Sequence, residues 1–70
     1  MDDIILKTLT LCLREDKPAI VIYEGAKGIS QRRVYVRKIT EQNVTVYCMQ
    51  KKGLRVFRLD GILSAKVADE

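Results

Sequence analysis

Apolar positions between residues 3 and 15 recur at the spacing of an amphipathic helix. Drawn at about 3.6 residues per turn, one stripe collects Ile5, Leu6, Leu9, Cys12 and Leu13. Asp2 or Asp3 would cap the first turn, and Pro18 would end the helix because proline cannot continue its hydrogen-bond ladder. Part of the segment also alternates at period two, which suits a strand. The width of the stripe favours a helix over residues 3–15.

After this segment the pattern changes to short β-forming runs separated by turns rich in glycine and polar residues. The runs are 19–23, 32–39, 44–49, 54–59 and 62–67. One helix followed by five short strands predicts a mostly β domain, a small antiparallel barrel that is closed or nearly closed. The helix stripe would cover an open end of this barrel. No repeat or linker divides the chain, so we expect one domain over residues 1–70.

The second predicted strand carries a candidate ligand surface. Arg33, Tyr35 and Arg37 share one face of this strand, while Val34 and Val36 share the other. Basic side chains bind phosphate, and an interleaved aromatic ring can stack on a base, which contributes about 1–3 kcal/mol per base in single-strand binders. The alternative is an ordinary solvated sheet face on which tyrosine and arginine pack across strands.

The fourth predicted strand adds two arginines. Arg55 and Phe57 point to one side of it and Arg58 points to the other, with Phe57 expected in the core. Arg58 either faces an anionic ligand or forms a salt bridge inside the domain, since Asp60 follows two residues later. Tyr47 of the third predicted strand would join the ligand surface if the strand register allows it.

The net charge of +4 conceals a segregation along the chain. Residues 25–58 hold nine Lys and Arg against one Glu, a net charge of +8, whereas the remainder holds four against eight acidic residues, a net charge of −4. A basic middle between acidic ends favours an anionic ligand. The other interpretation is that the charge serves solubility.

The residues that most enzymes and metal sites need are missing. The chain has no histidine, no glycine-rich loop that opens a helix and no nucleophile beside a base, so we expect neither catalysis nor a cofactor. Cys12 and Cys48 are too few for a zinc site, and their apolar surroundings predict buried structural thiols. No apolar run approaches the roughly 20 residues of a membrane span, and the start of the chain is acidic. We therefore expect a cytoplasmic protein.

Two apolar residues fall on the polar side of the predicted helix. Ile4 and Leu11 are seven residues apart and share that side. Single exposed apolar residues are normal on a protein surface. A pair of them predicts a contact with a second copy or with a partner domain.

The C-terminal half of the chain resembles a known family. Tyr47-Cys48, a basic turn with glycine, and then the run from Val56 to Leu63 (VFRLDGIL) are similar to the second half of a WYL domain. The tripeptide that names the family is absent at positions 42–44. The resemblance implies an Sm-like or SH3-like barrel with an N-terminal helix. It also implies the family's setting in bacterial transcription regulators, where such domains sense nucleic-acid ligands.

In that family the arginine of the Phe-Arg-Leu-Asp element belongs to the ligand surface, which implies this role for Arg58 and a supporting one for Arg55. The chain has no helix-turn-helix segment, so we expect a stand-alone or excised barrel. Our leading hypothesis is a non-catalytic regulatory domain for single-stranded nucleic acid, an oligonucleotide or another anionic ligand. The alternatives are a module that docks a partner regulator or a second copy through Ile4 and Leu11, and a less favoured Sm-type RNA ring.

Overall fold

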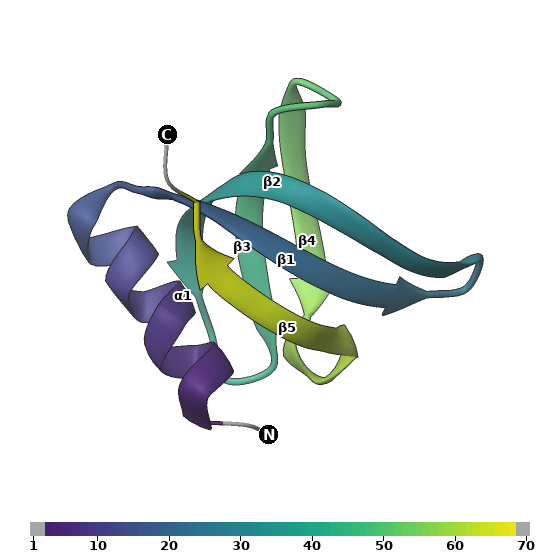
Figure 1. Cartoon of the computed structure of the whole chain (residues 1–70), viewed down its shortest axis with the longest axis horizontal. Helices are drawn as coiled ribbons and strands as arrows, with labels where there is room; N and C mark the ends of the chain where they lie inside the picture. The colour runs from purple at the N-terminus through teal and green to yellow at the C-terminus, as the bar shows by residue number, and fades with distance from the viewer. Residues whose placement is uncertain (1–2, 69–70) are drawn as a thin grey trace.

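The computed structural model describes residues 3–68 and contains one helix and five strands (Figure 1). The elements are α1 (Asp3–Glu15), β1 (Pro18–Gly25), β2 (Gly28–Ile39), β3 (Asn43–Cys48), β4 (Gly53–Arg58), the 3₁₀ turn η1 (Leu59–Gly61) and β5 (Ile62–Val67). The predicted order of a helix and five strands is confirmed. The sequence predicts the second strand over residues 32–39, but β2 begins at Gly28, because β1 and β2 stay paired up to a short turn at residues 26–27. The turn predicted at Asp60-Gly61 takes the form of the 3₁₀ turn.

All five strands form one antiparallel sheet in the order β4-β3-β2-β1-β5. The sheet curls into a small barrel-like fold, and the predicted fold class is confirmed. Its register shifts twice, between Ile22 and Tyr23 and between Val36 and Lys38. Such irregularities bend a strand and increase its twist. Because β4 and β5 stand at opposite ends of this order, the barrel stays open between them.

The core lies between the concave side of the sheet and α1, which packs on β5, β2 and β1. The buried cluster consists of Ile5, Leu9, Cys12, Ala19, Val21, Val34, Val36, Val44, Val46, Cys48, Leu59 and Ile62. Among residues 3–68 no polar or charged side chain is fully buried. The alternation of Val34 and Val36 with their polar neighbours is therefore the inside-outside alternation of a half-buried strand.

The helix stripe is confirmed at its centre and wrong at its margin. Ile5, Leu9 and Cys12 are buried, Leu6 is half-buried, and Leu13 is exposed. A helix advances about 100° per residue, so Leu6 and Leu13 lie roughly 80–100° from the centre of the stripe, where the sheet no longer covers them. The predicted cap at Asp2 or Asp3 falls on side chains outside the described part of the chain.

The end of α1 is set by a reversal of the backbone before Pro18. Asp16 has a positive φ of 55°, and the Lys17 N–H donates to the Cys12 carbonyl at 3.0 Å. This bond from a residue just past the helix to the last turn is the pattern that satisfies free helix carbonyls at a left-handed cap. The helix stop predicted at proline is thereby confirmed.

Tyr23 joins three elements at the end of the core. A Cβ atom added at Gly61 would lie 2.8 Å from Tyr23 Cε1 and 3.3 Å from the Glu24 carbonyl oxygen. The position therefore needs glycine so that η1 can approach β1 this closely. The ring of Tyr23 also stacks on Phe57 of β4, with 4.5 Å between ring centroids and 24° between planes. These contacts hold β1, β4 and η1 together.

Both cysteines are free and buried, as the sequence predicts. Burial raises the pKa of the Cys12 thiol above its usual value. Lys17 lowers this pKa by a smaller amount, and Glu15 raises it slightly further. Over residues 3–68 no group of three metal-ligating side chains occurs. The only helix of this part of the chain, α1, is too short to cross a membrane.

Candidate nucleic-acid interface

Two adjoining hollows open between the β1–β2 hairpin and β4. The smaller, about 170 Å³, is lined by Arg32, Lys51, Arg55 and Phe57. The larger, about 270 Å³, shares Arg32 and Phe57 and adds Tyr23, Gly25, Ala26, Lys27, Gly28, Ile29 and Ser30. We call the two hollows together the barrel mouth. Their described lining contains four cations and no carboxylate, which gives a concave surface of positive potential.

The strand register explains why these cations gather. Arg32 pairs with Val21 across β1 and β2, and Arg55 pairs with Val46 across β3 and β4. Directly opposed residues share a face of the sheet, and both valines are buried in the core. The two arginines therefore lie on the core face of the sheet, at the margin where this face reaches the solvent-filled mouth.

Arg32 lies near the Cys48 thiol at the end of β3. Burial raises the pKa of that thiol, but the backbone N–H groups of Lys51 and Gln50 and the guanidinium of Arg32 outweigh burial and lower the pKa overall. The environment of this sulfur thus reflects both the β3–β4 turn and one of the four mouth cations.

Phe57 supplies an apolar surface among these cations. It was expected in the core, but it is only half-buried and packs at the core's edge, because its ring lies over Tyr23 and not between the sheet and the helix. Its exposed part lines both hollows of the mouth. An aromatic face beside guanidinium groups is the combination that single-strand binders use for bases and phosphates.

The outer face of the sheet carries a second cluster. Tyr35 lies directly opposite Tyr47 in the β2–β3 register, so the register does bring Tyr47 to the predicted surface. Arg33 is two residues before Tyr35 on the same face of β2 and, like both tyrosines, is half-buried. Arg37 lies with its guanidinium carbon 5.7 Å from the centroid of the Tyr35 ring, within cation–π range.

Arg37 departs from the strict alternation expected of β2. The register shifts between Val36 and Lys38, so Arg37 lies in an irregular part of the strand. Its Nη1 also reaches Asp16 Oδ1 at 3.5 Å, and both side chains are exposed. Arg37 therefore connects the rim of the outer face to the end of α1.

Arg58 is separate from both clusters. It lies on the opposite face of β4 from Arg55, as predicted, and its Nη2 contacts Asp60 Oδ2 at 3.0 Å. The two side chains are 73% and 70% exposed, so the guanidinium is paired and also accessible to solvent. Exposed ion pairs contribute only about 0–1 kcal/mol to stability.

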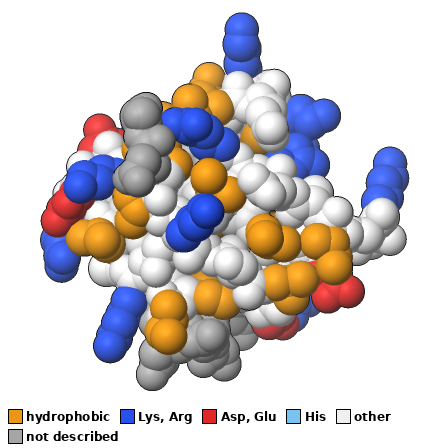
Figure 2. Space-filling model, viewed as in Figure 1, with side chains coloured by type: hydrophobic (Ala, Val, Ile, Leu, Met, Phe, Trp, Pro, Cys, Tyr) orange, Lys and Arg blue, Asp and Glu red, His pale blue; other side chains and the backbone are white. Residues whose placement is uncertain are grey.

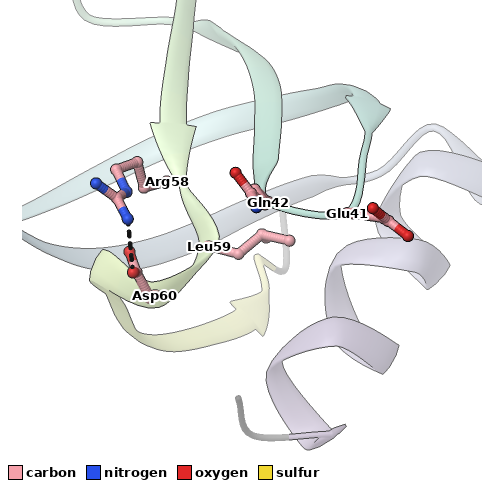
Figure 3. A pocket seen from close by; sticks show the side chains of 5 residues that line it. All are labelled: Glu41, Gln42, Arg58, Leu59 and Asp60. Carbon is pink, nitrogen blue, oxygen red and sulfur yellow. Dashed lines mark hydrogen bonds and ion pairs between the residues drawn. The ribbon is translucent and has the colours of Figure 1, made fainter.

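A third hollow, about 220 Å³, lies beside this ion pair and is lined by Glu41, Gln42, Arg58, Leu59 and Asp60 (Figure 3). The Leu59 N–H donates to the Gln42 carbonyl at 2.8 Å, which ties η1 to the β2–β3 turn. Glu41 and Asp60 give this hollow two carboxylates. These carboxylates make the hollow less suited to a polyanion than the barrel mouth is.

We expect Arg58→Ala to lower the free energy of unfolding by less than about 1 kcal/mol, because the ion pair is exposed. Urea denaturation measures this change. Oligonucleotide binding should weaken a few-fold, since an accessible guanidinium still attracts phosphate. The matched control is Asp60→Ala, which removes the other half of the pair and should not weaken binding. If Arg58→Ala costs more than about 2 kcal/mol, the ion pair is structural and our interpretation is wrong.

The positive charge is not gathered on one side of the molecule. Figure 2 shows lysine and arginine side chains at separate places around the outline, some of them next to acidic ones. The ion pairs among residues 3–68 are Lys17–Glu15, Arg37–Asp16 and Arg58–Asp60. None of them involves Arg32, Lys51 or Arg55. The mouth therefore brings together cations that form no ion pair with a described carboxylate.

The sequence interpretation included Arg55 but missed its neighbours. Arg32 belongs to the basic middle of the chain and Lys51 to the basic turn before the fourth predicted strand, but the sequence pattern did not single out either one as a ligand residue. One signal was available: Arg32 is in phase with Val34 and Val36, so it belongs to the core face of β2. An arginine in phase with core valines indicates the place where that face reaches solvent.

The helix and five-stranded open barrel superpose on a solved structure that contains a WYL domain, so the fold is WYL-like, as the resemblance at residues 47–62 implied. This assignment of the fold comes from a solved structure, proteasome accessory factor B/C (PafBC) of Arthrobacter aurescens, a transcription regulator that contains a WYL domain. The two superpose with a TM-score of 0.82 at 22% identity, over 93% of this chain and 11% of PafBC. The chain thus spans about a tenth of that protein's length. No family model matches the sequence, and no curated protein does.

Proposed function

We propose that the chain is a non-catalytic regulatory domain that binds single-stranded nucleic acid, or an anionic ligand of similar chemistry, at the barrel mouth. The observation that carries this proposal is the group of Arg32, Lys51 and Arg55 around the half-buried ring of Phe57, with no carboxylate in the described lining. The likeness in fold to PafBC, a transcription regulator, supports a regulatory setting.

The mouth suits a phosphate and a base held side by side. A guanidinium donates two parallel N–H bonds to phosphate oxygens, so Arg32 and Arg55 would grip the charge while Lys51 and Lys27 act as point charges nearby. A base would stack on the accessible part of Phe57. On the outer face, Arg33 with Tyr35 and Tyr47 offers a second platform for a longer strand.

A fluorescence titration with a labelled single-stranded oligonucleotide tests the proposal. If the four mouth cations neutralise four phosphates, log K should fall against log salt with a slope of roughly −3. The matched control is an oligomer of the same sequence with an uncharged backbone, whose binding should not depend on salt. Absence of binding at low salt, or a flat salt response with the charged strand, would contradict the proposal.

One observation favours a second candidate, a module that docks a partner protein or a second copy. Ile4 is 69% exposed on α1, whereas Leu11 is half-buried, so the paired exposure expected from the sequence holds for Ile4 only. A contact through Ile4 and Leu11 stays a prediction. If the chain has a monomeric mass in solution, the hypothesis that it forms a homodimer through this contact is wrong.

A further inference from the structure

β4 is an edge strand with an open backbone. It pairs with β3 along its whole length, with Gly53 opposite Cys48 at one end and Arg58 opposite Asn43 at the other. It stands at one end of the strand order. Every second residue of an edge strand directs its N–H and C=O groups away from the sheet, where they can pair with another strand. The opposite edge, β5, differs because α1 packs on it.

The two faces of this edge have different chemistry. Leu54 and Val56, which are 66% and 63% exposed, lie on the outer face opposite Tyr47 and Thr45. Arg55, between them, lies on the other face at the barrel mouth. Charged side chains commonly protect exposed edges, and β4 carries Arg55 and Arg58. Between and beside them it also presents two apolar side chains in a regular register, which could pack on a partner strand.

The charge around β4 decides between possible occupants. The strand and the turn before it carry Lys51, Lys52, Arg55 and Arg58, against two nearby acidic residues, Asp60 and Glu41, which lie at the Arg58 end. A second copy of β4 would bring like charges together across the new pairing, which is destabilising. A strand with acidic side chains on one face would instead meet opposite charges.

We propose that the β4 edge binds an extended peptide with apolar residues at alternate positions and Asp or Glu between them. Its backbone would continue the sheet, its apolar side chains would pack on Leu54 and Val56, and its carboxylates would face Arg55. At about 3.4 Å per residue, the six residues of β4 match a peptide of about six residues. This site goes beyond the oligonucleotide site and overlaps it at Arg55 and Phe57.

The probe for the test is a fluorescein-labelled hexapeptide of alternating valine and glutamate, titrated against the full chain by fluorescence anisotropy. We expect it to bind at least tenfold more tightly than the same peptide with lysine in place of glutamate. Methylating the backbone nitrogens on one edge of the peptide should abolish binding, and methylating those on the other edge should leave it within twofold. This difference reports strand pairing itself and not only charge attraction.

The protein variants are neutral substitutions at exposed positions. Leu54→Gln with Val56→Gln should weaken peptide binding at least tenfold, while the control Leu63→Gln on the β5 edge should leave it within twofold. Circular dichroism melting checks that each variant stays folded. If the double variant unfolds, the single variant Leu54→Gln is used in its place. Arg32→Gln should weaken oligonucleotide binding but leave peptide binding within twofold, so the two proposals fail separately.

Several outcomes would overturn the peptide site. They are absence of binding to the valine–glutamate peptide, equal binding of the lysine peptide, and equal losses from the β4 and β5 variants. Sedimentation of the unliganded chain, which measures its oligomeric state, provides one more outcome that would overturn the peptide site. If the chain dimerises, and Leu54→Gln returns it to a monomer, then the occupant of the edge is a second copy.

Discussion

Reversing the charge of Lys51 and Arg55 together (Lys51→Glu with Arg55→Glu) should weaken oligonucleotide binding by at least 100-fold. Both residues are exposed and line the smaller hollow of the mouth, so the change removes two phosphate contacts and adds repulsion. The slope of log K against log salt should also become shallower, from roughly −3 to roughly −1.5, because two fewer counterions are released on a single strand. A fluorescence titration at several salt concentrations measures both effects.

The control for this variant changes net charge by the same amount elsewhere. Lys7→Glu with Arg14→Glu reverses two exposed cations of α1. It should weaken binding far less than the mouth variant, because these cations line neither hollow. Equal losses in the two variants would mean that overall charge attracts the ligand, and the mouth would then have no specific role.

Leu9→Ala should lower the free energy of unfolding by about 3–5 kcal/mol, the cost of deleting a fully buried leucine side chain. The chain has 70 residues. At roughly 0.05–0.15 kcal/mol per residue, its total stability is about 4–10 kcal/mol. The substitution therefore removes a large part of the stability and tests whether α1 seals the core. Urea denaturation followed by circular dichroism measures the change.

Leu63→Ala is the matched control, because this leucine is 47% exposed on β5. It should cost less than about 1 kcal/mol, since little apolar surface is removed from contact. A loss below about 1 kcal/mol for Leu9→Ala would show that α1 does not dock on the sheet as described. The comparison separates burial in the core from the general effect of shortening a leucine.

The predictions that succeeded depend on local chemistry. The helical spacing of apolar residues and the break at Pro18 located α1, and alternation in β2 assigned Val34 and Val36 to the inside. Alternation also separated Arg55 from Arg58, whose faces the strand geometry determines directly. The failure at Leu13 has the same origin, because a periodic pattern does not show where the covering sheet ends.

The candidate site could be predicted only in part. The outer cluster of Arg33, Tyr35 and Tyr47 needs the alternation of the strands and also the register shift between Val36 and Lys38. Without that shift, the register nearest the turn would place Tyr35 opposite Cys48 and not opposite Tyr47. The barrel mouth requires more information. Tyr23 meets Phe57, and Arg32 shares a hollow with Arg55, although these partners are far apart in the sequence.

The amino-acid sequence by itself determined the elements, their order, the inward-facing residues and the excess of positive charge between residues 25 and 58. These properties follow from side-chain spacing and backbone restrictions that act over a few residues. The tertiary structure alone decided which cations converge, that Arg58 forms an ion pair with Asp60, and that β4 keeps an open edge. The convergence of the cations and the open edge depend on the curvature and strand order of the sheet, which arise from packing between distant segments. The Arg58–Asp60 pair depends on how η1 turns the chain after β4.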